Sequence, residues 1–156
     1  MMLQNILYYT PRLLVALILL QTLYFKFGIG GPEALAESQE IFGIMSEAIL
    51  GSAEQEAVMR IGTGILELAT AVLIIVPSTA YIGAIIGAGT MAGAVMSHLL
   101  FIGIEVRGDG GQLFIMAILV LLSAIKVAFD EKDKILGIFK KWLGVYLTTK
   151  DPDPIL

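Results

Sequence analysis

The chain has 156 residues, of which 57% are hydrophobic and only 15% charged, and its mean hydropathy is +0.86. A soluble domain of this size carries about a quarter charged residues, so this composition indicates an integral membrane protein. With no cysteine and a single histidine, the chain offers no disulfide, no cysteine-ligated metal and no multi-histidine site, so we expect no metal and no haem. The net charge of −4 argues against a nucleic-acid partner.

Four apolar runs have the length of about 17–25 residues that crosses the hydrocarbon core of a bilayer. They cover residues 13–29, 58–76, 79–103 and 111–129. Only Pro77 and Ser78 separate the second run from the third, and residues 104–110 join the third to the fourth. Such short connections require antiparallel neighbours. The predicted fold class is therefore all-α, an integral membrane four-helix antiparallel bundle over residues 1–130, followed by a tail over residues 131–156.

Charge is distributed unevenly along the chain. Residues 30–57 contain six glutamates and no lysine or arginine, whereas five lysines follow Phe129. By the positive-inside rule both termini lie in the cytoplasm and the acidic segment lies outside.

Two segments outside the apolar runs have apolar residues at helical spacing. The acidic segment is too charged to cross the bilayer, and we expect an amphipathic cap over the outer mouth of the bundle. In the tail, an apolar face lies opposite a row of lysines, which predicts an interfacial helix on anionic lipid, with docking of a soluble partner as the alternative. The tail residues concerned are Ile135, Ile138, Phe139, Trp142, Leu143 and Tyr146 on the apolar face, and Lys134, Lys140 and Lys141 opposite.

Polar side chains inside the apolar runs are costly in hydrocarbon and each requires an explanation. Lys126 lies near a membrane surface, which its long side chain can reach, so we interpret it as structural. At about 1.5 Å of rise per residue, the others fall mostly in the outer half of the bilayer. These candidate site residues are Gln21, Lys26, Arg60, Glu67, His98 and Gln112.

Helical spacing places the charged candidates toward the interior of the bundle. Arg60 and Glu67 share one stripe with small residues between them, and His98 shares another with Gly87 and Met91. One interpretation is a buried ion pair of Lys26 or Arg60 with Glu67 that only fixes helix register, with His98 bonded to a neighbouring helix. The number of polar groups in one half of the bundle favours the other interpretation, a polar cavity that opens outward.

At these residues the chain resembles the DoxX/DoxD family of small four-span membrane proteins. The resemblance covers about residues 10–130 and rests on three stretches: Tyr-Phe-Lys-Phe-Gly at 24–28, Gly-Thr-Gly-Ile-Leu-Glu-Leu at 62–68, and the small-residue-rich stretch 83–98 with Asp-Gly-Gly-Gln-Leu at 109–113. One branch of the family resembles the membrane subunit of thiosulfate:quinone oxidoreductase, and others are partners of secreted redox enzymes. The resemblance implies a bacterial or archaeal inner membrane and a quinone-linked role. Related quinone-reducing bundles work through pairs of cysteines. This chain has no cysteine, so the resemblance does not imply that chemistry here.

The sequence therefore predicts a membrane subunit whose cavity binds a quinone or small polar ligand and couples it to a redox partner protein. Lys26, Arg60, Gln21 and Gln112 are the predicted ligand-binding residues, and Glu67 and His98 the predicted catalytic ones, which supply or accept a proton. Two alternatives stay open, a non-catalytic membrane scaffold and a small-solute or proton pathway. Whether the chain turns over a substrate, and whether it forms a homo-oligomer, also stay open.

Overall fold

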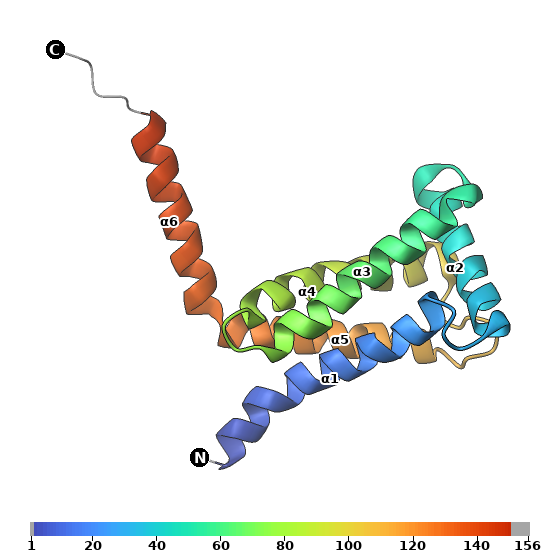
Figure 1. The fold of residues 1–156 in the computed structure, drawn as a ribbon, viewed down its shortest axis with the longest axis horizontal. Coiled ribbons are helices and arrows are strands. Elements are labelled where there is room, and N and C mark those ends of the chain that lie inside the picture. The colour runs from blue at the N-terminus through green and yellow to red at the C-terminus, as the bar shows by residue number, and fades with distance from the viewer. Residues whose placement is uncertain (1, 151–156) are drawn as a thin grey trace.

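The computed structural model describes the backbone of residues 2–150 and the side chains of residues 2–143. Every regular element within residues 2–150 is helical (Figure 1), which confirms the all-α class. The elements in chain order are α1 (Met2–Lys26), α2 (Pro32–Leu50), the 3-10 helix η1 (Ala53–Gln55), α3 (Glu56–Ile75), α4 (Ala80–Ser97), the π-helix η2 (His98–Ile102), α5 (Gln112–Asp130) and α6 (Lys132–Lys150).

Four of these helical segments are long and apolar enough to cross a membrane, as the sequence predicted. They cover Met2–Lys26, Ala53–Ile75, Ala80–Ile102 and Gln112–Asp130. The first differs from its predicted bounds of 13–29, because α1 begins at residue 2 and ends at Lys26. Gly28, with φ +69, lies just beyond that end. A glycine in this left-handed conformation is the usual way for a helix to stop.

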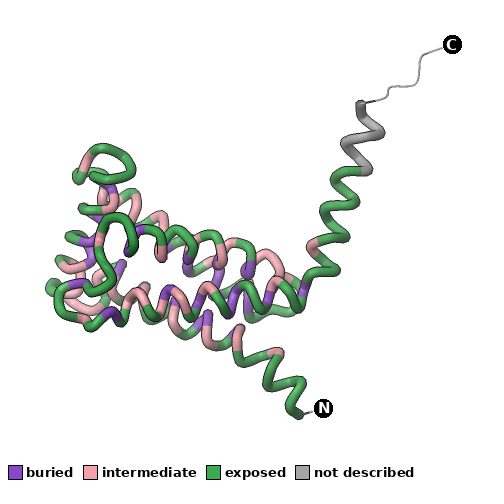
Figure 2. Tube along the Cα trace, turned by 180° about the vertical axis from the view of Figure 1, so that it is seen from behind, coloured by how far each residue is buried: buried purple, intermediate pink, exposed green. Residues whose placement is uncertain are grey.

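The four long segments lie side by side (Figure 1). Helix α4 packs against α3 and α5, and α1 packs against the same two helices. Fully buried aliphatic side chains fill the space between them, among them Val15, Leu19, Ile74, Val120 and Val127. Much of the outer side of the four helices is exposed (Figure 2). It includes large apolar side chains from all four, which is the surface that a helix in lipid presents.

Small residues bring particular helices close together. A Cβ atom at Gly83 would lie 2.6 Å from the backbone nitrogen of Ile74, so α3 and α4 touch backbone to backbone beside their connecting turn. A Cβ atom at Gly64 would lie 2.7 Å from the ring of Phe27. This second contact holds the end of α1 against α3, where Lys26 and Glu67 lie.

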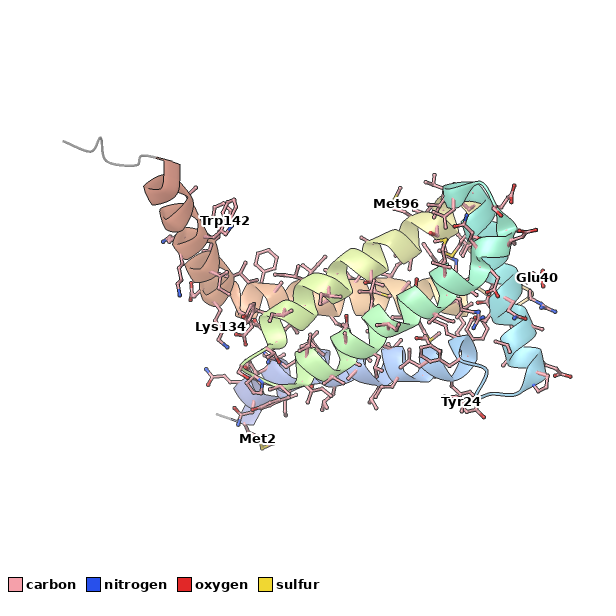
Figure 3. All side chains as sticks on the ribbon, turned by 45° about the horizontal axis from the view of Figure 1, so that its top comes forward. Met2, Tyr24, Glu40, Met96, Lys134 and Trp142 are labelled. Atoms are coloured by element: carbon pink, nitrogen blue, oxygen red, sulfur yellow. The ribbon has the colours of Figure 1, made fainter. Side chains whose placement is uncertain are left out.

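Two helices stand apart from the four. Helix α2 lies across the end of the molecule remote from the N-terminus (Figure 1) and buries Ser38, Ile41, Phe42 and Ser46. Helix α6 projects from the opposite end, with Trp142 and Lys134 both on it (Figure 3). Its apolar side chains are largely exposed, with Trp142 61% exposed. Tyr146 and Lys150 lie outside the side chains that the structure describes.

Candidate functional site

A cavity of about 320 Å³ lies at the α2 end of the molecule and is lined by α1, α2, α3, α4, η2 and α5. Most of its wall is apolar and includes aromatic and methionine side chains. The polar residues on the wall are Thr22, Lys26, Thr63, Glu67, Thr90, Ser97 and His98. A mainly apolar cavity with a few convergent polar groups is typical of a small-molecule binding site.

A buried ion pair forms the polar part of the cavity wall. Lys26 Nζ lies 2.9 Å from Glu67 Oε2, and the two side chains are 8% and 4% exposed. The hydroxyl of Thr22 donates a hydrogen bond of 2.9 Å to the same carboxylate oxygen. Lys26 also lies in the last turn of α1, where the unpaired carbonyl groups of the helix favour a cation.

The pair leaves hydrogen-bonding capacity unused. Among the described residues, Lys26 Nζ forms an ion pair with Glu67 and lies 5.8 Å from the centre of the Phe42 ring, and Glu67 Oε1 accepts no hydrogen bond. An ammonium carries three donors, so two are available to a molecule in the cavity. The buried ion pair thus presents both a donor and an acceptor to a ligand.

His98 lines the same cavity from the first position of η2 and is buried. Its Nδ1 lies 2.8 Å from the carbonyl oxygen of Gly103, and its ring meets the edge of Phe114 at 5.5 Å between centroids. Because a carbonyl only accepts, Nδ1 carries the hydrogen and Nε2 is the atom left for proton exchange. The π-helical turn was not predicted, since the sequence pattern is that of a continuous helix. Such turns occur often at functional sites.

Arg60 has a different role from the one predicted. Its guanidinium bonds Glu56, with Nε 2.8 Å from Oε2, and its Nη1 donates to the backbone carbonyl of Lys26 at 2.6 Å. Arg60 is not among the described residues that line the cavity. Of the two expected partners of Glu67, Lys26 or Arg60, the structure shows Lys26. The reason is geometric: Glu56 lies one turn away on the same helix, whereas Glu67 lies two turns away. Arg60 ties the end of α1 to α3.

Gln21 and Gln112 also lie outside this cavity. Both are exposed, and they line a neighbouring hollow of about 220 Å³ together with Glu37 and Asp109. Of the six predicted residues, Lys26, Glu67 and His98 line the cavity. The hollow that Gln21 and Gln112 line shares Thr22, Phe25, Leu113 and Met116 with it. Gln21 precedes Thr22 by one residue, which is a rotation of about 100° around the helix and turns its side chain away from Glu67.

Asp109 is a residue whose role was missed. Its carboxylate accepts hydrogen bonds from the backbone N–H groups of Val106, Gly111 and Leu113, at 2.8, 2.9 and 3.0 Å. Burial raises the pKa of Asp109, but these three bonds and the nearby His98 outweigh burial, and the pKa lies below its ordinary value. Asp109 thereby fixes the loop before α5, and an Asp-Gly-Gly sequence before an apolar run is a recognisable signal for a helix start.

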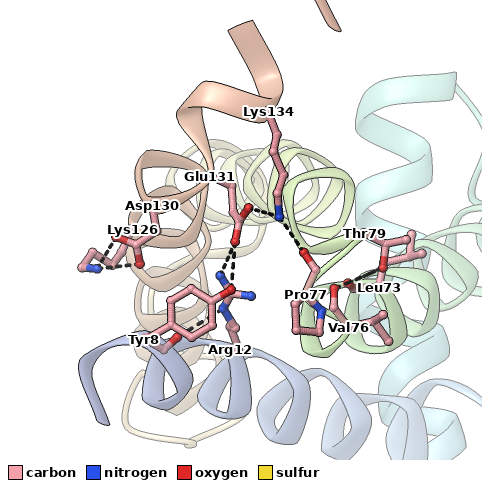
Figure 4. Close-up of polar contacts among 10 residues, drawn as sticks. All are labelled: Tyr8, Arg12, Leu73, Val76, Pro77, Thr79, Lys126, Asp130, Glu131 and Lys134. Carbon is pink, nitrogen blue, oxygen red and sulfur yellow. Dashed lines mark hydrogen bonds and ion pairs between the residues drawn. The ribbon is translucent and has the colours of Figure 1, made fainter. Parts of the chain in front are cut away.

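A second buried charge cluster, also missed, lies at the other end of the molecule (Figure 4). Arg12 Nη2 lies 2.7 Å from Glu131 Oε1, with the side chains 1% and 5% exposed. The Tyr8 hydroxyl donates to the same oxygen at 3.1 Å, and Lys134 Nζ lies 2.6 Å from Glu131 Oε2 and 2.9 Å from the carbonyl of Pro77. The cluster joins α1, the turn between α3 and α4, and the start of α6.

Burial raises the pKa of Glu131, but the hydrogen bonds from Lys134, Arg12 and Tyr8 lower it more, so its pKa lies below the ordinary value. The sequence signal for this cluster is weak. Arg12 reads as a headgroup-facing residue before the first apolar run, and Glu131 is one of five consecutive charged residues, 130–134.

The comparisons with known proteins give no match. No family model, no curated protein and no solved structure matches this chain.

Proposed function

We propose that the chain is a four-span membrane protein, similar to the DoxX/DoxD proteins, whose cavity binds a quinone or another small polar ligand for a redox partner protein. The carrying observation is the buried pair of Lys26 and Glu67 on the cavity wall, with two donors and one carboxylate oxygen unused among the described residues. An ion pair that only stabilises the fold would be most stable if all of its donors and acceptors were hydrogen-bonded. Donors and acceptors that face a cavity instead suit a ligand.

The proposed orientation places both termini and α6 in the cytoplasm of a bacterium or archaeon, with α2 as an outer cap. The N-terminus and the start of α6 lie at the same end of the molecule (Figure 1). That end carries the lysines of residues 126–141, whereas α2 carries glutamates. The positive-inside rule then assigns the two sides of the membrane.

In this site Lys26 would donate hydrogen bonds to a ligand carbonyl, as a charge-assisted donor in a dry surrounding. Glu67 and the Nε2 atom of His98 would hold and exchange the protons that accompany reduction. A bound quinone takes up two electrons and two protons to become a quinol. With no cysteine in the chain, the partner protein would supply the electrons.

A pathway through a single copy of the chain has less support. The half of the molecule next to the α3–α4 turn is filled by side chains with no exposed surface, Val15, Ile74, Val120 and Val127. These packed side chains leave little space for water or ions, although Thr70 and Ser123 are buried in the same half of the molecule. The cavity therefore suits a binding site better than a channel.

The test is a binding titration in lipid nanodiscs with a quinone headgroup analogue that lacks an isoprenoid chain. We expect saturable binding to the wild type and a loss of about tenfold or more in the variant Lys26→Met/Glu67→Leu, because charge-assisted hydrogen bonds contribute about 1.5–3 kcal/mol. The double variant removes both charges and so leaves neither unpaired. Gln21→Ala, on an exposed glutamine outside the cavity, is the control and should bind as the wild type does. Equal binding by all three proteins, or none by the wild type, would contradict the proposal.

A further inference from the structure

The cavity reaches the outer surface of the molecule between α3 and α4. Four exposed residues belong to its wall, and three of them lie here: Leu66 of α3, which is 47% exposed, and Gly89 and Gly93 of α4. The fourth is Ile49 of α2, which is 50% exposed. The same wall contains the buried side chains of Lys26 and Glu67. One continuous space therefore leads from the ion pair to the side of the molecule.

The glycines of α4 have different surroundings along the helix. Near the turn that connects α3 and α4, Gly83 touches the backbone of Ile74, and one turn further a Cβ atom at Gly87 would lie 2.7 Å from the Thr70 side chain. Beyond this point a Cβ atom at Gly89 or Gly93 would meet no atom within 4 Å. The two helices touch beside their connecting turn, and further along α4 Gly89 and Gly93 place no side chain on the cavity wall.

The depth of this opening matters for what can enter it. Gly89 and Gly93 lie on either side of the middle of the segment Ala80–Ile102, and Leu66 lies near the middle of Ala53–Ile75. At about 1.5 Å per residue, each lies within roughly 3 Å of the centre of its segment along the helix axis. With the helices in a membrane, the opening would face the hydrocarbon core rather than water or headgroups.

We infer that the ligand is an amphiphile: its polar head would lie at Lys26 and Glu67, and its apolar chain would pass between α3 and α4 into the bilayer. This inference rests on the proposed function, because it requires that the cavity binds a ligand. A water-soluble molecule gains nothing from an opening into hydrocarbon. A lipid-soluble one is already concentrated there, and its chain need not be desolvated again on binding.

The first test narrows the opening with the variants Gly89→Leu and Gly93→Leu. The control is Gly62→Leu, because Gly62 lies on α3 with open space around it and does not line the cavity. Two probes are titrated in nanodiscs, a quinone with a decyl chain and the same headgroup without the chain. We expect the decyl compound to bind at least about tenfold more weakly to the two variants, because a leucine would occupy the space of the chain. The chainless headgroup should bind within about twofold of wild type, and Gly62→Leu should change neither affinity.

The outcomes separate the two proposals. If the wild type binds neither probe, the proposed function fails and the inference fails with it. If it binds both probes and the leucine variants change neither affinity, the function stands and the opening is wrong. If folded leucine variants bind both probes equally more weakly, the inferred path of the chain is also contradicted, since the leucine would then fill the headgroup position.

A second test needs no substitution. A quinone that carries a photoreactive diazirine early in its chain is bound to the wild type, irradiated, and the labelled peptides are mapped. We expect labels on residues 59–66 of α3 and 89–97 of α4. Labels confined to α1, α2 or α5 would overturn the inference.

Discussion

Lys26 Nζ lies 2.9 Å from Glu67 Oε2, and this contact joins the last turn of α1 to the middle of α3 inside the molecule. Both residues belong to segments that are apolar enough to cross a membrane. In such surroundings each charge depends on the other, because a buried charge that loses its partner is costly. The pair therefore both holds two helices together and defines the polar wall of the cavity.

We predict that Glu67→Gln lowers the free energy of unfolding by about 3–5 kcal/mol, because it leaves a buried ammonium without its counter-ion. Unfolding by sodium dodecyl sulfate in mixed micelles measures this change. The variant Lys26→Met/Glu67→Gln should recover most of the loss. The matched control is Glu40→Gln, whose partner Arg107 is 51% exposed and which should change stability by less than about 1 kcal/mol. An unchanged unfolding curve for Glu67→Gln would mean that Glu67 is solvated or neutral.

We predict that two C-terminal deletions differ sharply in effect. Deletion of residues 135–156 keeps Glu131 and Lys134, so the four long segments should keep wild-type stability. Deletion of residues 131–156 removes the partner of the buried Arg12 and should cost about 3–5 kcal/mol. Arg12→Met should restore much of that loss in the longer deletion. Equal stability of both deletions would show that the Arg12–Glu131 pair contributes nothing.

We predict that Asp109 stabilises the folded protein and that this contribution to the free energy of unfolding is lost in acid. Its pKa in the folded protein is lowered, so its stabilising effect is complete above the unfolded value of about 3.9 and is lost as the pH falls through the folded pKa. Asp109→Asn should therefore destabilise by about 1 kcal/mol at pH 7 and by progressively less below about pH 4. Glu105→Gln, an exposed acid in the same loop, is the control. A difference from wild type that is constant with pH would contradict the assigned hydrogen bonds.

We predict that Trp142 lies at the membrane surface. It is the single tryptophan of the chain, so its fluorescence reports on α6 alone, where its ring lies 6.4 Å from that of Phe139. In vesicles with anionic lipid, brominated chains labelled near the headgroup should quench it more than chains labelled near the terminal methyl. Lys140→Glu/Lys141→Glu should weaken this quenching, since each lysine near an anionic surface contributes about 1 kcal/mol. No quenching in the wild type would favour a protein partner for this face.

Regular spacing made part of this structure predictable. Arg60, Gly64 and Glu67 share a buried stripe on α3, and Met91 and His98 are buried as their spacing indicated. Helical periodicity decides which residues share a face, and apolar length decides which helices can cross a membrane. These two signals were sufficient to predict the four segments. They also gave Lys26 as one of the two candidate partners of Glu67.

Partner choice was not predictable in the same way. Arg60 had two acidic residues within reach of its helix face, and the nearer one, Glu56, pairs with it. Arg12 and Glu131 are 119 residues apart, and no local pattern relates them. The cavity itself depends on how closely its lining helices approach one another, which is a property of packing between helices. Sequence periodicity contains no information on that distance.

The most direct measurement is native mass spectrometry, with lipid extraction, of the protein purified in mild detergent from its own membrane. If the cavity is a quinone site, the wild type should retain about one equivalent of a quinone, and the Lys26→Met/Glu67→Leu variant should retain much less while unfolding cooperatively, because the binding groups are lost and the helices are not. Gln21→Ala should retain as much as the wild type. A wild-type protein that is folded and carries no quinone, or a double variant that carries as much, would contradict a quinone site at Lys26 and Glu67.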